Sequence, residues 1–130
     1  MPVLFDPESA YTMSAPEIHD HVRGSRRAIL YARVSSKEQE QGYSIQAQQE
    51  FLRLYAAQHD LVIDKEFVDV HTARRPGRGG FNEMLHYLRK NPGCRVILVE
   101  KTDRLYRNLA DTAAVEALVE GSGVEVHLQR

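Results

Sequence analysis

The 130-residue sequence has a single cysteine and no long apolar run. Cys94 alone cannot build a disulfide framework, so we expect a reducing compartment and an inert, buried thiol. No stretch approaches the roughly 18 to 20 apolar residues of a membrane span, and the N-terminus has no basic segment followed by an apolar block. These absences predict a soluble, cytoplasmic protein without a membrane partner.

The sequence also lacks a large net charge, which is -1, but its charges are unevenly distributed. Between residues 74 and 107, nine Lys or Arg residues accompany only three Asp or Glu residues, which favours an anionic partner for this region. A GxxxxGK[ST] loop is missing, which argues against binding of a nucleoside triphosphate. His19 and His21 have no further ligands beside them, so we expect no metal and no other cofactor.

Segments with strand and helix periodicity alternate from residue 26 onward. Residues 1–25 hold three of the five prolines and show no sustained periodicity, so we expect a flexible leader followed by one domain. The alternation predicts an α/β fold, a three-layer αβα sandwich with a mostly parallel sheet of four to five strands. We expect strands at 27–34, 61–70, 94–100 and 124–129, and helices at 37–58, 80–91 and 108–121.

Unusual polar residues stand at the ends of three expected strands. The first strand ends in Arg33 and Ser35, and the second ends in Asp69. Ligands of such folds gather at the carboxyl ends of the strands, so a hydroxyl and several guanidiniums would face one crevice. The other members are Thr72, Arg74, Arg75 and Arg78 after the second strand, and Asp103, Arg104 and Arg107 after the third.

Each of these residues also has an ordinary structural explanation. Ser35 and Glu38 fit a capping box, in which the serine only starts a helix. Asp103 and Arg107 could form an i,i+4 helix pair, and an arginine-rich loop is commonly solvated.

Two features favour a phosphate site instead. Gln48 falls within the apolar stripe of its helix, so a polar group must meet its amide. Arg104 and Arg107 would share a helix face and repel each other unless an anion lies between them. Converging arginines suit the charge of a phosphoryl-transfer transition state, which makes Ser35 a candidate nucleophile. Since only His71 lies near these segments and no triad is evident, we favour activation by cationic surroundings over a histidine base.

Three segments carry these residues together: YARVSSKEQEQGYSIQAQ, FVDVHTARRPGRGGFNEML and VILVEKTDRLYRNLAD. In this order and spacing they resemble the catalytic domain of the serine recombinases, the resolvase/invertase superfamily, and especially its large-serine-recombinase branch. The similarity covers about residues 26–128. It implies a serine that attacks a DNA phosphodiester, giving a 5′-phosphoserine link and a free 3′ hydroxyl, with double-stranded DNA as the partner.

The resemblance also implies roles for individual residues. Ser35 matches the nucleophile, Arg33 matches the arginine two residues before it, and Gln48 matches the glutamine of the following helix. Arg78 stands at the arginine of the Arg-Pro-x-Phe/Leu element, with Gly79 in place of proline. The implied catalytic set is Ser35, Arg33, Gln48, Asp69, Arg78, Asp103, Arg104 and Arg107, and Arg74, Arg75 and Lys101 are expected to contact DNA.

The family continues beyond the position of Arg130 into a dimerisation helix and DNA-binding domains. We therefore expect residues 26–130 to be a catalytic domain truncated before those parts, and the full-length protein to act as a homodimer that becomes a tetramer. Three alternatives remain open at this point. They are a catalytically silent α/β interaction or dimerisation module, a tyrosine-type recombinase or nuclease that uses Tyr106, and a phosphatase-like enzyme for small phosphate esters.

Overall fold

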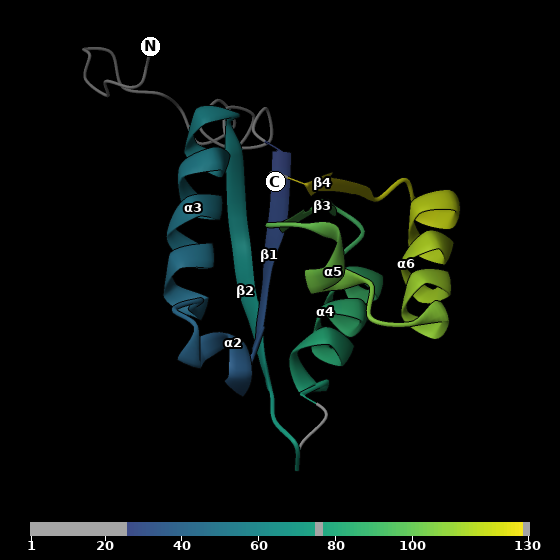
Figure 1. Ribbon diagram of the computed structural model, residues 1–130. Helices are drawn as coiled ribbons and strands as arrows, with labels where there is room; N and C mark the ends of the chain where they lie inside the picture. Colours follow the sequence, from purple (N-terminus) through teal and green to yellow (C-terminus); the bar gives the residue numbers. More distant parts are fainter. Residues whose placement is uncertain (1–25, 75–76, 129–130) are drawn as a thin grey trace, which may run out of the picture.

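The computed structural model describes residues 26–74 and 77–128, so the expected leader at 1–25 and the expected DNA contact of Arg75 lie outside the described residues. Four parallel strands form one sheet in the order β2-β1-β3-β4 (Figure 1). The strands are β1 (Arg26–Ser35), β2 (Leu61–His71), β3 (Cys94–Val99) and β4 (Glu125–Leu128). The helices are α2 (Ser36–Glu40), α3 (Ile45–Gln58), α4 (Gly79–Lys90), α5 (Thr102–Leu105) and α6 (Leu109–Ser122).

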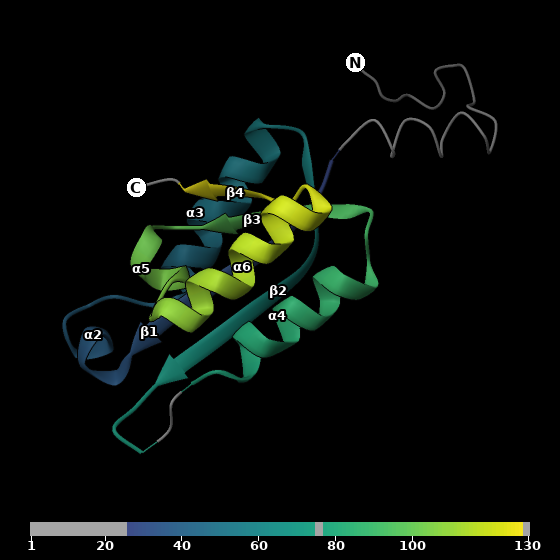
Figure 2. The same ribbon diagram turned by 90° about the vertical axis from the view of Figure 1, so that its right-hand side faces the viewer.

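Helices cover both faces of the sheet, as the αβα prediction requires. Helix α3 lies on one face, and α4 and α6 lie on the other (Figures 1 and 2). This division follows from the strand order, because the chain moves outward from β1 to β2 in one direction and from β3 to β4 in the opposite direction. Right-handed crossovers then place the helices on opposite faces, and the strand order reverses between β1 and β3, the type of position near which α/β folds bind ligands.

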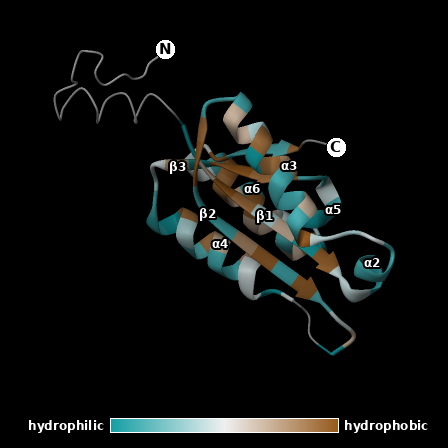
Figure 3. Ribbon diagram, turned by 90° about the vertical axis from the view of Figure 1, so that its left-hand side faces the viewer, coloured by the Kyte–Doolittle hydropathy of each residue, from teal (hydrophilic) through white to brown (hydrophobic). Residues whose placement is uncertain are grey.

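The core is built on the central strand β1, whose side chains alternate between the two faces. Ala28 and Leu30 pack with α3, and Ile29 and Tyr31 pack with α4 and α6; all four are 0% exposed. Apolar residues follow the strands through the middle of the molecule (Figure 3). Burial on both faces explains why the strand sequence is an uninterrupted apolar run. Among the described residues, no helix is both long and apolar enough to cross a bilayer.

Two helix predictions are wrong in detail. The predicted helix over 37–58 is interrupted, because Gly42 adopts φ +98° and Ser44 begins α3 by accepting a hydrogen bond from the Ala47 amide at 3.0 Å. The chain also leaves the helical conformation at Tyr106 (φ -99°, ψ 102°), directly after α5. Arg104 and Arg107 therefore do not share a helix face, and the proposed i,i+4 helix pair of Asp103 with Arg107 does not form.

Candidate active site

Buried polar side chains concentrate at the carboxyl end of the sheet. Among the described residues, five polar or charged side chains are buried, and each lies near the end of a strand or in the first turns of the helix that follows. A buried polar group is costly unless it is paired, so this end of the fold is held by specific contacts rather than by apolar packing. The five residues are Gln48, Asp69, Glu100, Arg104 and Asp111.

Ser35 is the last residue of β1 and the N-cap of α2. Its Oγ accepts a hydrogen bond from the Glu38 amide at 3.0 Å, while its own amide donates to Oε1 of Glu38 at 2.9 Å. The capping box suggested by the sequence is therefore present. Ser35 also lines a pocket of about 340 Å³ with Ser36, Lys37, His71, Thr72 and Ala73. The residue starts a helix and borders an open space at the same time.

The carboxylate of Glu38 joins Ser35 to Arg104. Its Oε1 accepts from the Ser35 amide and, at 2.7 Å, from Nη1 of Arg104. Burial disfavours the charged form of Glu38, but the hydrogen bonds from Arg104 and from the Ser35 amide outweigh this and lower its pKa. Arg104 is only 1% exposed, with Nε 3.5 Å from Glu100 and its guanidinium 5.6 Å from the ring centre of Tyr43.

Arg33 and Gln48 form a second contact group beside the first. The Gln48 side chain accepts from the Arg33 amide at 3.2 Å and donates to the Arg33 carbonyl at 3.0 Å. The last residues that pair between β1 and β3 are Tyr31 and Val99. Beyond this pair, the Gln48 side-chain amide hydrogen-bonds to the main chain of β1 where β3 has ended. This main chain is the polar partner that the inward position of Gln48 requires. The Arg33 guanidinium donates to the main-chain carbonyls of Asp103 and Arg104.

Asp69 holds the start of α4. Its Oδ1 accepts from the Gly80 amide at 2.7 Å, and its Oδ2 accepts from the Phe81 amide at 2.8 Å and from the Tyr31 hydroxyl at 2.6 Å. Burial and the bond to Asp69 raise the pKa of Tyr31. A carboxylate at a helix N-terminus satisfies amides that have no partner within the helix. The hydrogen bonds of Asp69 thus orient α4, and with it the preceding Arg78; within the described part of the chain, none of these bonds goes to a guanidinium.

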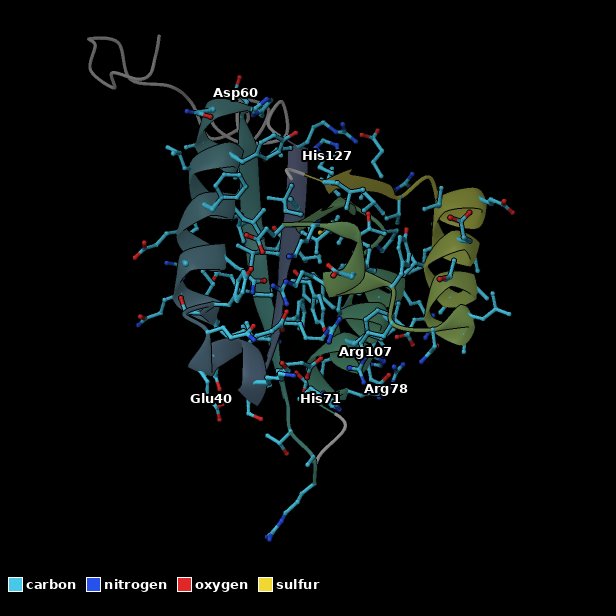
Figure 4. The ribbon with its side chains drawn as sticks, viewed as in Figure 1. Glu40, Asp60, His71, Arg78, Arg107 and His127 are labelled. Atoms are coloured by element: carbon cyan, nitrogen blue, oxygen red, sulfur yellow. The ribbon has the colours of Figure 1, made fainter. Side chains whose placement is uncertain are left out.

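Arg78 and Arg107 are fixed by acceptors on other elements. Arg78 forms a two-point pair with the buried Asp111 of α6, at 2.9 Å and 2.5 Å, and this bond raises the pKa of the guanidinium. Arg107 donates from Nη1 to the carbonyl of Gly77 at 2.8 Å. Figure 4 places Arg78, Arg107 and His71 at the same end of the molecule.

The structure brings part of the predicted set together. Burial lowers the pKa of Arg33, and the positive charges of Arg107 and Arg104, which lie close enough to act on it, lower it further. Asp103 is exposed and contributes its carbonyl to this group. Of the predicted DNA contacts, Arg74 is exposed and Lys101 places its ammonium 5.4 Å from the ring centre of Tyr43.

Several residues at this end were not in the predicted set. Glu38 could be found from its spacing to Ser35, since a capping box predicts that the two side chains meet. His71 becomes a neighbour of Ser35 only through strand pairing, and no sequence spacing reveals that contact. Asp111, which holds Arg78, likewise comes from another element, whereas Glu100 stands only four residues before Arg104 and could be found from that spacing.

A parallel α/β domain with a serine hydroxyl and several guanidiniums at the carboxyl end of its sheet defines a domain suited to phosphoryl transfer. The family model described as "Resolvase, N terminal domain" matches residues 28–130. The chain belongs to this family and is the catalytic domain of a serine recombinase, a DNA strand-transferase that catalyses site-specific recombination. Membership implies a DNA substrate and an oligomeric assembly.

Solved structures agree with this assignment. A resolvase family site-specific recombinase from Streptococcus pneumoniae is 31% identical, with a TM-score of 0.65 over 80% of this chain and 70% of that one. The C-terminal catalytic domain of ISC1926 TnpA, an IS607-like serine recombinase, is 26% identical, with a TM-score of 0.64 over 80% and 67%. The N-terminal catalytic domain of TP901-1 integrase, at 23% identity and a TM-score of 0.60 over 80% and 77%, shares the fold.

Proposed function

We propose that Ser35 is the nucleophile of a DNA cleavage and rejoining reaction. Its Oγ attacks the scissile phosphorus, the bond from phosphorus to the 3′ oxygen breaks, and a 5′-phosphoserine link and a 3′ hydroxyl result. Attack of a 3′ hydroxyl on that link reverses the step and joins the new strands. Because the phosphoserine ester retains the energy of the broken diester, rejoining requires no nucleotide cofactor. The observation that carries the proposal is the position of Ser35, beside a pocket at the end of the central strand.

The proposed phosphate ligands are the guanidiniums of four arginines. These groups bind protein oxygens, so phosphate oxygens would replace some of those acceptors. A donor is already available in one case, since Nη2 of Arg104 is buried and has no hydrogen-bond partner among the described residues. Tyr43 and Glu38 would have to move before DNA could reach it, because Arg104 is 1% exposed. The four proposed ligands are Arg33, Arg78, Arg104 and Arg107.

The remaining predicted residues have supporting roles in this proposal. Gln48 holds the main chain of Arg33, Asp69 sets the start of α4, and the Asp103 carbonyl fixes the Arg33 guanidinium. Arg74, Arg75 and Lys101 would bind the DNA backbone, which makes affinity fall steeply with salt. We further propose that the working assembly is a DNA-bound homodimer that becomes a tetramer in the full-length protein, that residues 26–130 are its catalytic part, and that it acts in the cytoplasm.

A trapped covalent intermediate tests the proposal. A pool of DNA duplexes with a randomised core carries a nick, so that a short cleaved fragment diffuses away and the protein-linked strand accumulates. We expect an adduct with the unmodified chain, none with Ser35→Ala, and an unchanged yield with Ser36→Ala as the matched control. Mass spectrometry of the DNA-linked peptide should place the phosphate on Ser35. Phosphate on Tyr106 would refute the assignment, and the absence of any adduct would favour the silent interaction module.

A further inference from the structure

His71 lies beside Ser35 through the pairing of β1 with β2. The two residues are register partners in adjacent parallel strands, whose backbones run about 4.8 Å apart. Partners in neighbouring strands direct their side chains to the same face of the sheet. The imidazole of His71 and the hydroxyl of Ser35 therefore start from neighbouring positions on one face.

A β-bulge determines this pairing. Ala28 pairs with Ile63 but Ile29 pairs with Lys65, so Asp64 is an extra residue in β2. Without the bulge, the residue opposite Ser35 would be the one before His71, and every later side chain of β2 would be on the other face. Asp64 is held by hydrogen bonds from Nε of Arg27 at 2.8 Å and from the Tyr87 hydroxyl at 3.0 Å. The register is therefore anchored at the opposite end of the strand.

Among the described residues that line the pocket beside Ser35, one has a side chain suited to accept a proton. Of its six lining residues, Ser36 and Thr72 carry weakly basic hydroxyls, Lys37 carries an ammonium, and Ala73 carries no polar group. The imidazole of His71 is the remaining group, and an imidazole is the usual side-chain base near neutral pH. His71 is exposed, so the pocket and its imidazole are open to an incoming substrate.

The hydrogen bonding of Ser35 is compatible with a proton acceptor on the pocket side. Its Oγ accepts from the Glu38 amide at 3.0 Å, and a hydroxyl that accepts one hydrogen bond still has its own proton to donate. The Glu38 carboxylate is engaged through Oε1, which receives both the Ser35 amide and Arg104, and these bonds make it a poor acceptor for the Ser35 proton. On the pocket side, the His71 imidazole offers an acceptor instead.

We propose that His71 is the general base for Ser35. This inference rests on the proposed function. As the bond from Oγ to phosphorus forms, the Ser35 proton moves to the neutral imidazole; the 3′ oxygen leaves with the electron pair of the broken P–O bond and takes a proton from water. During rejoining, the imidazolium returns a proton to the Ser35 oxygen as the phosphoserine ester breaks. The serine is thus activated by a histidine from the neighbouring strand as well as by the surrounding arginines.

A small phosphorus electrophile tests this step separately from DNA cleavage. An alkyl fluorophosphonate phosphonylates an activated serine: the bond from Oγ to phosphorus forms, and the fluoride leaves without needing a proton. The rate therefore reports removal of the Ser35 proton. The full chain is compared with His71→Ala, His71→Gln and the exposed control His86→Ala on α4. Loss of a general base should slow Ser35 labelling by about 10²-fold or more in both His71 variants. Added imidazole should restore much of the rate in His71→Ala, and His86→Ala should label normally.

The same variants are run with the nicked duplexes, where the proposal expects a matching loss of adduct formation. Rates unchanged by both His71 substitutions, or a normal rate in His71→Gln, would overturn the assignment, because glutamine preserves size and polarity but cannot take the proton. Failure of the proposed function has a different signature. In that case DNA gives no adduct in the unmodified chain, while fluorophosphonate labelling still reports whether His71 activates Ser35.

Discussion

Replacing Glu38 by alanine should destabilise the domain more than any ordinary surface substitution. The change removes the acceptor of Nη1 from Arg104, which is 1% exposed, and the side-chain half of the capping box, while the main-chain amide of residue 38 can still donate to Ser35 Oγ. Removing one member of a buried ion pair costs about 3 to 5 kcal/mol. Arg104 retains Glu100 at 3.5 Å, and the Glu38 side chain is 29% exposed, so a value near the lower end, about 3 kcal/mol, is expected.

Urea denaturation followed by circular dichroism measures the effect. With a urea m-value of about 1 to 3 kcal/mol per molar, the midpoint should fall by about 1 to 3 M. Glu38→Gln keeps an oxygen that can accept from the Ser35 amide and from Arg104, so its free energy of unfolding should fall by much less, about 1 kcal/mol. Glu40→Ala, on the exposed side of the same short helix α2, is the matched control and should stay within about 0.5 kcal/mol of the unmodified chain.

The stability contribution of the Glu38 carboxylate should also depend on pH. The pKa of Glu38 is lowered from its ordinary value of 4.5, so its stabilisation is present above that value and is lost as the pH falls through the lower folded-state pKa. The Glu38→Ala variant should therefore show a smaller loss of stability on acidification. If Glu38→Ala and Glu40→Ala unfold at the same urea concentration, the buried Arg104 does not depend on the Glu38 carboxylate for its stability.

Three further predictions follow from other contacts. Gly80→Ala should lower the free energy of unfolding by about 2 kcal/mol more than Gly79→Ala in the same denaturation assay. A Cβ at residue 80 would overlap a β2 carbonyl, whereas one at residue 79 meets nothing within 4 Å. Equal values for the two variants would contradict the close approach of α4 to β2. Tyr31→Phe removes a 2.6 Å hydrogen bond to the buried Asp69 carboxylate and should lower the free energy of unfolding by about 2 kcal/mol. An unchanged stability would mean that water replaces the hydroxyl. The hydrogen bond from Arg26 lowers the pKa of Glu125 to about 2. The NMR resonance of the Glu125 carboxyl carbon should therefore titrate near pH 2, and its midpoint should move toward pH 4.5 in Arg26→Ala. An unchanged midpoint would exclude the Arg26–Glu125 pair as the cause.

The sheet could be predicted because its strands are apolar on both faces. Every expected strand agrees with the structure to within one residue at each end, as do α4 and α6. The failures occur where a short polar segment decides the conformation. Gly42 and Ser44 stop and restart a helix inside a stretch whose apolar spacing alone predicts continuity. Tyr106 ends α5 although nothing in its neighbourhood is a helix breaker.

The candidate site could be predicted only as a set of residues, because contacts between elements depend on strand order and register. The expectation that Gln48 meets a polar group is confirmed by its two bonds to the Arg33 main chain. The partner of Arg78 is Asp111, thirty-three residues further along the chain, and no local pattern connects them. His71 depends on a bulge at Asp64, which is a feature of strand pairing rather than of composition.

Protein oxygens hold the arginines at the carboxyl end of the sheet. Each of the four arginines proposed to bind phosphate has a protein oxygen as its partner: a carboxylate for Arg78 and Arg104, and main-chain carbonyls for Arg33 and Arg107. These two kinds of partner differ in strength, because a charged acceptor holds a guanidinium more tightly than a neutral carbonyl does. Phosphate should therefore recruit Arg33 before Arg78 and Arg104. Recruitment of Arg104 would require Glu38 to release it, and because the same carboxylate oxygen accepts from the Ser35 amide, movement of Glu38 would also loosen the side-chain half of the capping box beside the proposed nucleophile.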